Sequence, residues 1–192
     1  MKILSLTLLL AASLFSQAPA PANSWRIDPL HSQANFTVRH MMISTVRGTF
    51  GGVRGTIIYD AKNPAASTVE ATIDCTTLNT GEPKRDNDLK GEEFFDVKKY
   101  PRAVFKGSLQ SPVGGVPTQL VGELTLHGVT RPLTLAVNSL KCIQHPMLKR
   151  DYCGADASGS FNRDDFGLGM GKEYGFKMNV DLRVQVEAIA QP

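Results

Sequence analysis

Residues 176–187 read FKMNVDLRVQVE, and this stretch decides the fold class because apolar and polar side chains alternate along all of it. Phe176, Met178 and Val180 begin the apolar series, and Lys177 begins the polar one. A period of two residues places successive side chains on opposite faces of a β-strand. The stretch is therefore predicted to be a strand with one buried and one solvated face.

The same alternation recurs upstream and predicts about eight strands in all. Clean patterns cover residues 69–75, 120–126 and 133–137, weaker ones cover residues 103–109 and 155–161, and two longer ones cover residues 24–40 and 46–60. The pair His127-Gly128 predicts a tight hairpin turn. Residues 82–100 are charged and do not alternate, so we expect one short helix there, with Pro83 in its first turn and its end near Gly91.

The composition fits one globular domain. The chain has 192 residues with 21 Lys+Arg, 18 Asp+Glu, a formal net charge of +3 and 42% hydrophobic residues. This length can bury a sizeable core, and the composition excludes a disordered chain, a collagen-like repeat and a Cys-dense mini-scaffold. The charge forms no basic block, which argues against a nucleic-acid binder. The 17 Gly and 11 Pro residues favour many short strands separated by turns.

About eight antiparallel strands with one helical insertion can close as a barrel or stack as a sandwich. An even strand number with short sequential connections favours an all-β, up-and-down barrel, because closure removes exposed edges. Such a barrel holds packed side chains or one small ligand. Small residues fall on the predicted inner faces, where they leave ligand volume or relieve crowding in a coiled sheet; both readings stay open for Ala34, Ala71, Gly107, Gly122, Ala157 and Gly159.

Residues 1–22 have the pattern of a secretory signal peptide. Lys2 is followed by an apolar stretch at residues 3–15 and by small residues at 18–22. The apolar stretch is shorter than the roughly 20 residues of a membrane span, which disfavours an uncleaved anchor. We therefore expect cleavage after this segment, a mature domain at residues 23–192, and a periplasmic or secreted location.

Export changes how the three cysteines are interpreted. In an oxidising compartment Cys142 and Cys153 are predicted to form a disulfide across a loop of about ten residues. Two free thiols or a metal pair would fit the same spacing. Cys75 falls in phase with the inward residues of its strand, so we expect a buried, unreactive thiol.

The four histidines are scattered and predict no metal site. His31 and His40 are separated by an odd number of positions, so a regular strand points His40 inward and His31 outward. His127 lies in the predicted turn, and His145 lies between the paired cysteines. An inward His40 is either a hydrogen-bonded core side chain or a polar anchor for a ligand. The glycines of residues 167–171 precede a strand, so we expect a flexible connection rather than a phosphate-binding loop.

Ordered motifs along nearly the whole chain after residue 22 resemble those of the YceI-like family. They are WRIDPLHS (25–32), FTVRHM (36–41), VRGTF (46–50), VEATID (69–74), RDNDL (85–89), FFDV (94–97), YP (100–101), GELTLHGVTRP (122–132) and NRDDFGL (162–168). The resemblance implies an extended, lipocalin-like antiparallel barrel with a helix alongside. It also implies an internal apolar tunnel for a long-chain lipid, typically a polyisoprenoid or isoprenoid quinone and in some members a fatty amide, with no established catalytic activity.

On this resemblance we expect a non-enzymatic lipid-binding protein that transports, stores or sequesters an isoprenoid lipid, without other cofactors, metal or nucleic acid. Its expected partners are a membrane or a quinone-using membrane protein, in transient contact, and its expected state is a monomer or homodimer. The expected ligand-contacting residues are Phe36, Val38, His40, Phe50, Ile73, Phe94, Phe95, Phe105, Leu124, Leu126, Phe161, Phe176, Met178 and Val180. His31, Arg39 and His40, near one end of the first long strand, are the expected contacts of the ligand's head group.

Two alternatives stay open at this point. One is an enzyme acting on an isoprenoid lipid, with His31 or His40 as the acid–base group. The other is a stress-related structural module with a solid core, which binds no ligand. No Ser-His-Asp grouping or carboxylate dyad can be assembled from the predicted strands, so no catalytic residues are predicted.

Overall fold

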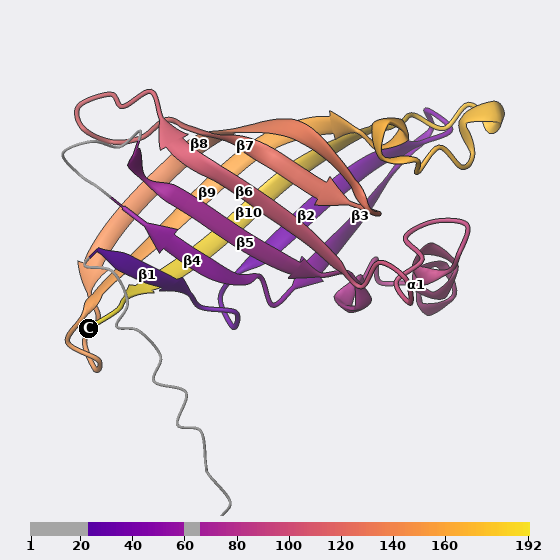
Figure 1. Ribbon diagram of the computed structural model, residues 1–192. Coiled ribbons are helices and arrows are strands. Elements are labelled where there is room, and N and C mark those ends of the chain that lie inside the picture. The colour runs from indigo at the N-terminus through magenta and orange to yellow at the C-terminus, as the bar shows by residue number, and fades with distance from the viewer. Residues whose placement is uncertain (1–22, 60–65) are drawn as a thin grey trace, which may run out of the picture.

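The structure is a computed structural model that describes residues 23–59 and 66–192. The predicted signal peptide at residues 1–22 lies outside the described residues. The described residues form ten β-strands and one α-helix (Figure 1). The strands are β1 (Ser24–Ile27), β2 (Gln33–His40), β3 (Ser44–Gly51), β4 (Arg54–Ile58), β5 (Thr68–Asp74), β6 (Arg102–Gln110), β7 (Gln119–Leu126), β8 (Val129–Gln144), β9 (Asp151–Asn162) and β10 (Asn179–Ala190). The helix is α1 (Pro83–Lys90), and short 3-10 helices include η2 (Cys75–Thr77), η3 (Arg163–Phe166) and η4 (Lys172–Tyr174).

Eight of these strands close a ring. Their order is β1-β4-β5-β6-β7-β8-β9-β10, and β1 pairs with β10 to complete it. Every pairing is antiparallel, and the β2–β3 hairpin extends the sheet from the other half of β10. The predicted all-β antiparallel barrel of about eight strands, with one helical insertion, is therefore confirmed.

The first long strand, predicted as unbroken over residues 24–40, is interrupted in the structure. Its two parts, β1 and β2, both pair with β10, one after the other. Pro29 lies in the gap and has no N–H to donate to a ladder. The hydroxyl of Ser32 accepts a hydrogen bond from the backbone N–H of Glu187 at 3.0 Å. A side chain therefore replaces the missing ladder partner at the break.

Left-handed backbone positions mark two other turns. The second long strand, predicted over residues 46–60, breaks between β3 and β4 at Gly52, where φ is +65°. Glycine adopts this conformation at little cost. Residue 60 itself lies outside the described residues. The predicted hairpin turn between β7 and β8 is confirmed, with φ of +51° at His127 and +76° at Gly128.

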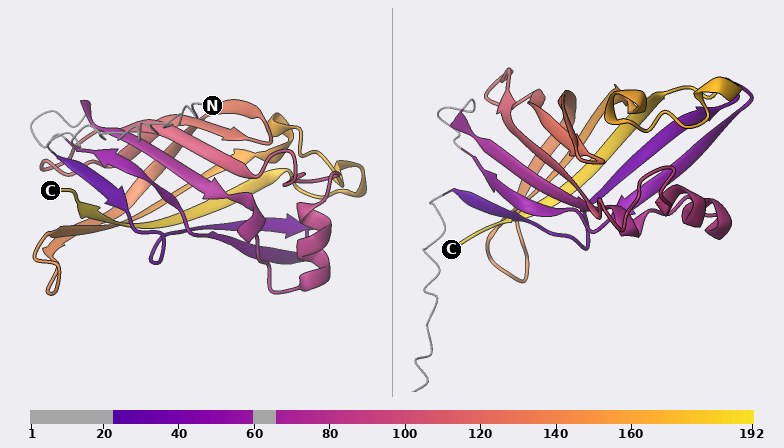
Figure 2. Two further views of the ribbon diagram at one scale, coloured as in Figure 1. Left: turned by 60° about the horizontal axis from the view of Figure 1, so that its bottom comes forward. Right: turned by 45° about the vertical axis from the view of Figure 1, so that its right-hand side comes forward.

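Helix α1 has the predicted boundaries. Pro83 is in its first turn, the carboxylate of Glu82 accepts a hydrogen bond from the N–H of Lys84 at 3.1 Å, and Gly91 caps the other end. The helix lies at one end of the barrel, below the turn between β2 and β3 in Figure 1, and the loop with η4 projects at this same end (Figures 1 and 2). We call this the helix end. The β8–β9 turn and the C-terminus lie at the opposite end, which we call the disulfide end.

The packed core occupies one wall of the barrel. Buried apolar side chains of β5 to β9 form it together with Phe166 of η3, which is 1% exposed, and Leu168, which is 4% exposed. Inward side chains such as Phe50, Leu182 and Val184 pack against this cluster but are only partly buried. The barrel is therefore tightly packed on one side and less filled toward the other.

Candidate functional site

The barrel encloses a cavity of about 650 Å³ with a predominantly apolar lining. On β10, Val180, Leu182, Val184, Val186 and Ala188 all line it, as the period of two requires. Three of these five side chains are only partly buried although they point into the barrel. Their remaining surface faces the cavity. The choice between a hollow and a solid interior, which the sequence left open, is resolved in favour of a hollow one.

Most of the residues predicted to contact a ligand line this cavity. They are Phe36, Val38, His40, Phe50, Ile73, Phe94, Phe95, Phe105, Leu124, Leu126, Phe161, Phe176 and Val180. Met178 is 8% exposed but does not line the cavity. Because β10 begins only at Asn179, the alternation does not extend back to Met178, whose carbonyl instead accepts a hydrogen bond from the N–H of Arg163 at 2.8 Å.

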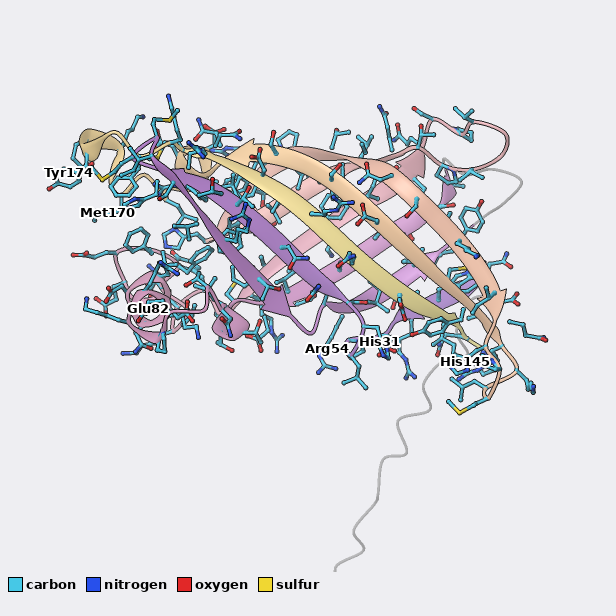
Figure 3. The ribbon with its side chains drawn as sticks, turned by 180° about the vertical axis from the view of Figure 1, so that it is seen from behind. His31, Arg54, Glu82, His145, Met170 and Tyr174 are labelled. Atoms are coloured by element: carbon cyan, nitrogen blue, oxygen red, sulfur yellow. A yellow bond between two sulfur atoms is a disulfide. The ribbon has the colours of Figure 1, made fainter. Side chains whose placement is uncertain are left out.

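Charged side chains in the lining gather at the helix end. Arg85 and Asp88 come from α1, Arg163 from η3, and the phenol of Tyr174 from η4. Tyr174 is 69% exposed while it also lines the cavity. Figure 3 shows Tyr174 and Met170 together at this end, far from His145. The helix end therefore forms a mouth where the cavity meets solvent.

Alternation could not have found these mouth residues. Arg85 and Asp88 lie on a helix, and Arg163 and Tyr174 lie on 3-10 turns, where a period of two does not apply. The sequence motifs RDNDL and NRDDFGL contain three of them. Those motifs were the only available signal, and they carried no information about which way each side chain points.

His40 points into the cavity as its phase in β2 predicts. Its ring packs edge-on against Phe176, with 4.6 Å between ring centroids. Within the described residues the His40 ring has no hydrogen-bond or ion-pair partner. This geometry suits a polar group offered to a ligand better than a core histidine held by a neighbour.

Arg163 holds the glycine-rich loop in place. Its guanidinium donates one hydrogen bond to the carbonyl of Leu168 and a second to the carbonyl of Met170 at 2.8 Å. Burial lowers the pKa of this guanidinium from its ordinary value. Residues 167–171 thus connect η3 to η4, and the hydrogen bonds of Arg163 hold this connection, which was expected to be flexible, with Leu168 and Met170 in the lining.

The structure places the other two expected head-group contacts outside the cavity. The imidazole Nδ1 of His31 lies 2.7 Å from Oδ2 of Asp28, on the outer surface at the break between β1 and β2. This hydrogen bond raises the pKa of His31. Arg39 points to the outer face of β2 and donates hydrogen bonds to Oγ1 of Thr45 and to the carbonyl of Met42. The strand phase, which sends His40 inward, sends Arg39 outward.

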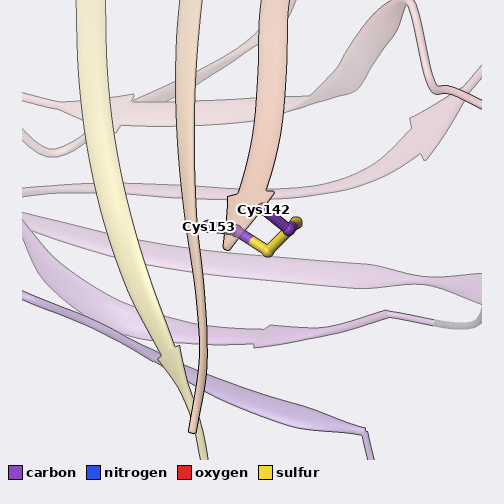
Figure 4. The surroundings of a disulfide bond; sticks show 2 residues. All are labelled: Cys142 and Cys153. Carbon is purple, nitrogen blue, oxygen red and sulfur yellow. A yellow bond between two sulfur atoms is a disulfide. The ribbon is translucent and has the colours of Figure 1, made fainter. Parts of the chain in front are cut away.

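The predicted disulfide is present. Cys142 and Cys153 are cross-strand partners on β8 and β9, their sulfurs are bonded, and both line the cavity (Figure 4). The side chains of Trp25 and Tyr59 line the same end. Cys75 is a free, buried thiol that also lines the cavity, and burial raises its pKa to about 11.

The inward glycines do not supply ligand volume. A Cβ on Gly107 would lie 2.5 Å from the carbonyl oxygen of Val121, and one on Gly122 would lie 2.2 Å from that of Lys106. A Cβ on Gly159 would lie 2.7 Å from the side chain of Leu135. Their space is taken by neighbouring strands of the coiled sheet. The inward alanines Ala34, Ala71 and Ala157, by contrast, do line the cavity.

Within residues 23–59 and 66–192, no group of three or more His, Cys, Asp or Glu side chains is arranged to hold a metal ion. Over the same residues, no helix has the length and apolarity needed to cross a membrane.

A closed eight-stranded ring around an apolar cavity defines the class of hollow, lipocalin-like antiparallel barrels. The model of the YceI-like domain matches residues 25–188, and the chain belongs to the YceI-like family. Protein YceI of Escherichia coli O17:K52:H18 is 34% identical over 195 residues, which cover 100% of both chains. Protein YceI of Salmonella newport is 32% identical over 186 residues, covering 95% of each.

Solved structures share the fold. BcnA of Burkholderia cenocepacia superimposes with a TM-score of 0.69 at 21% identity, covering 84% of this chain and 98% of that one. A polyisoprenoid binding domain from Saccharophagus degradans, implicated in plant cell wall breakdown, superimposes with a TM-score of 0.64 at 18% identity. That match covers 87% of this chain and 98% of the other.

Proposed function

We propose that this protein holds a polyisoprenoid or an isoprenoid quinone inside the barrel, for transport, storage or sequestration. The observation that carries the proposal is the apolar cavity of about 650 Å³. Its volume falls in the range of roughly 300–1,000 Å³ that is usual for ligand sites. A prenyl chain is insoluble because each buried CH₂ is worth about 0.8 kcal/mol, so an enclosed apolar wall stabilises it.

The shape of the cavity favours a long chain over a compact ligand. Strands β9 and β10 each have 12 residues. At about 3.3 Å per residue and a tilt of about 40°, such strands span roughly 30 Å along the barrel axis. Lining residues extend from Tyr174 at the helix end to Cys142 at the disulfide end. An extended apolar chain can use this length.

The head group is proposed to lie at the helix end, near His40. The mouth offers His40, Arg85 and Tyr174 as polar contacts, whereas the middle of the barrel is apolar. His31 and Arg39 remain outside this arrangement. The polyisoprenoid binding domain from Saccharophagus degradans has the same fold, which supports an isoprenoid ligand here by analogy.

Binding is favoured over catalysis. A general acid or base is normally oriented by a second hydrogen-bonding group, and no such partner for His40 exists within the described residues. We further propose a periplasmic or secreted location with removal of residues 1–22, leaving the domain at 23–192. The disulfide supports an oxidising compartment. The mass of the protein purified from each cell fraction tests both statements.

Native purification followed by organic extraction and mass spectrometry tests the ligand. The delipidated protein should also take up a long-chain ubiquinone presented in detergent, which can be followed by extraction of the bound quinone and by the change in Trp25 emission when the prenyl chain alters its surroundings. This is the one tryptophan of the chain, and it lines the cavity. The variant Ala71→Phe should block uptake because Ala71 lines the cavity, whereas Ala136→Phe should not, since Ala136 is exposed on β8. Absence of lipid from the extract together with absence of uptake would refute the proposal.

A further inference from the structure

The turn between β2 and β3 exposes three consecutive apolar side chains. Met41 is 49% exposed, Met42 is 53% exposed and Ile43 is 81% exposed. The N–H of Ile43 donates to the carbonyl of His40 at 3.1 Å and closes the turn. We call these three residues the hairpin tip. Together they form a continuous apolar protrusion at the helix end.

The backbone of the hairpin tip is unfavourable for these residue types. Met41 has φ of +48° and Met42 has φ of +63°. Two successive left-handed residues define a turn that asparagine and glycine favour. Methionine gains nothing here by burial, because both side chains are exposed. Residues that break a local rule without a folding benefit are found mainly at functional sites.

The hairpin tip lies beside the mouth of the cavity. His40, which precedes the tip, lines the cavity and contacts Phe176 of the opposite loop. The end of the hairpin and the η4 loop lie side by side in Figures 1 and 2. On that loop, Met170 is 38% exposed and Tyr174 is 69% exposed, and both line the cavity. Exposed apolar groups thus continue from the tip to the mouth.

Two arginines without a carboxylate partner within the described residues lie on the strands next to the hairpin tip. Arg39 and Arg47 lie on the outer face of β2 and β3, and within the described residues neither has a carboxylate within ion-pair distance. Arg39 donates to the carbonyl of Met42 at 2.8 Å, which braces the tip. Asp181, on the adjacent strand, faces the same side. Membrane interfaces are bound by surfaces in which exposed apolar side chains enter the head-group region and nearby cations attract anionic lipids. The hairpin tip and the two arginines have this arrangement.

We propose that the hairpin tip, with Met170 and Tyr174, docks on the surface of a bilayer that contains anionic lipids. The mouth of the cavity then faces the membrane, and a lipid can move between bilayer and barrel without crossing water. This inference rests on the proposed function, since it names the surface from which the same cavity is loaded.

The opposite hairpin provides a competing surface and a matched control. Ile143, near the end of β8, is 51% exposed, and in the turn that follows Met147 is 82% exposed and Leu148 is 51% exposed, with Lys149 beside them. These side chains match the hairpin tip in number and chemistry. We favour the hairpin tip because Met170 and Tyr174, the large apolar and aromatic residues that are both exposed and part of the lining, lie at the helix end.

Vesicle co-sedimentation tests the docking surface. The probe is phosphatidylcholine vesicles with or without phosphatidylglycerol, and the delipidated wild-type protein should bind those with phosphatidylglycerol. The triple variant Met41→Ser/Met42→Ser/Ile43→Ser should bind about tenfold or more weakly. The matched triple variant Ile143→Ser/Met147→Ser/Leu148→Ser should bind like the wild type. Arg47→Gln should weaken binding and reduce its salt dependence. Circular dichroism checks that each variant is folded.

The outcomes separate this inference from the proposed function. Docking is overturned if the wild type binds neither kind of vesicle, or if only the β8–β9 variant loses binding. If the Met41/Met42/Ile43 variant still takes up ubiquinone from detergent but not from vesicles, both ideas stand. If the wild type takes up ubiquinone from detergent yet never binds vesicles, only the docking inference fails. Ala71→Phe should keep vesicle binding while losing uptake.

Discussion

Truncation of one leucine on the cavity wall tests whether the barrel is hollow in solution. Leu182 of β10 lines the cavity and is partly buried, whereas Leu78 is 1% exposed and does not line it. Both can be replaced by alanine, so the chemistry of the two changes is identical. Leu→Ala substitutions in packed cores destabilise by about 2.7–5 kcal/mol, because lost contacts and a new cavity add together.

The expected cost at Leu182 is smaller. The substitution removes three carbons, worth about 2.4 kcal/mol when fully buried at about 0.8 kcal/mol per CH₂. Leu182 has neighbours on only part of its surface, so about half of this, roughly 1 kcal/mol, should be lost. Leu78→Ala should cost about 3 kcal/mol or more, since its site is closed on every side. The two variants should therefore differ by about 2 kcal/mol.

Urea unfolding of delipidated protein, followed by circular dichroism, measures both free energies. Delipidation matters because a ligand that binds only the folded state adds stability by mass action. Readdition of ubiquinone should stabilise wild type and Leu78→Ala equally, and should stabilise Leu182→Ala less. Equal destabilisation by the two alanines in the delipidated protein would mean that the interior around Leu182 is filled, and the hollow barrel would be wrong.

Three further predictions concern the cysteines and His31. Reduction of the bond between Cys142 and Cys153, separated by 11 positions, should lower the free energy of unfolding by about 3 kcal/mol; in urea unfolding, a loss below about 1 kcal/mol would contradict this. The pKa of Cys75 is raised to about 11 by burial, so iodoacetamide at about pH 8 should label it only after unfolding; rapid labelling of the native protein would show an accessible thiol. The hydrogen bond that His31 donates to the carboxylate of Asp28 raises the folded-state pKa of His31 above its ordinary value of 6.5, so the stabilisation is complete below that pH and is lost as pH rises through the folded pKa. The stability difference between wild type and His31→Gln should therefore shrink as the pH rises above 6.5, and a difference that grows would contradict the ion pair.

Alternation along the strands predicted the fold and the inward side chains of the barrel well. Val180 and His40 point where their phase places them because each lies within a regular strand. The same rule failed at Met178, which lies just before β10 starts. It also did not predict the interruption between β1 and β2 at Pro29. A period of two applies only between the ends of a strand, and those ends depend on turns that pattern alone does not locate.

Sequence patterns did not predict which residues form the mouth of the cavity or which small side chains leave space inside it. Arg85 and Tyr174 come from a helix and a 3-10 turn, which are brought together only by tertiary structure. The sequence left open whether Gly107 provides ligand volume or relieves crowding, and in the structure the adjacent strand fills that position. Whether a missing side chain leaves space depends on the separation and coiling of neighbouring strands, which composition does not report.

The attachment of the β2–β3 hairpin makes the two ends of the barrel unequal. The ring of eight strands closes through β1, so the hairpin is hydrogen-bonded along one side to β10. On its other side, Thr49 exchanges backbone hydrogen bonds of 2.9 and 3.0 Å with Asn79, and Gly51 donates to Thr77. On this side few hydrogen bonds hold the β2–β3 hairpin to the rest of the barrel, whereas at the disulfide end a covalent bond joins β8 to β9. We therefore expect ligands of different width to displace the β2–β3 hairpin more than the strands joined by the disulfide.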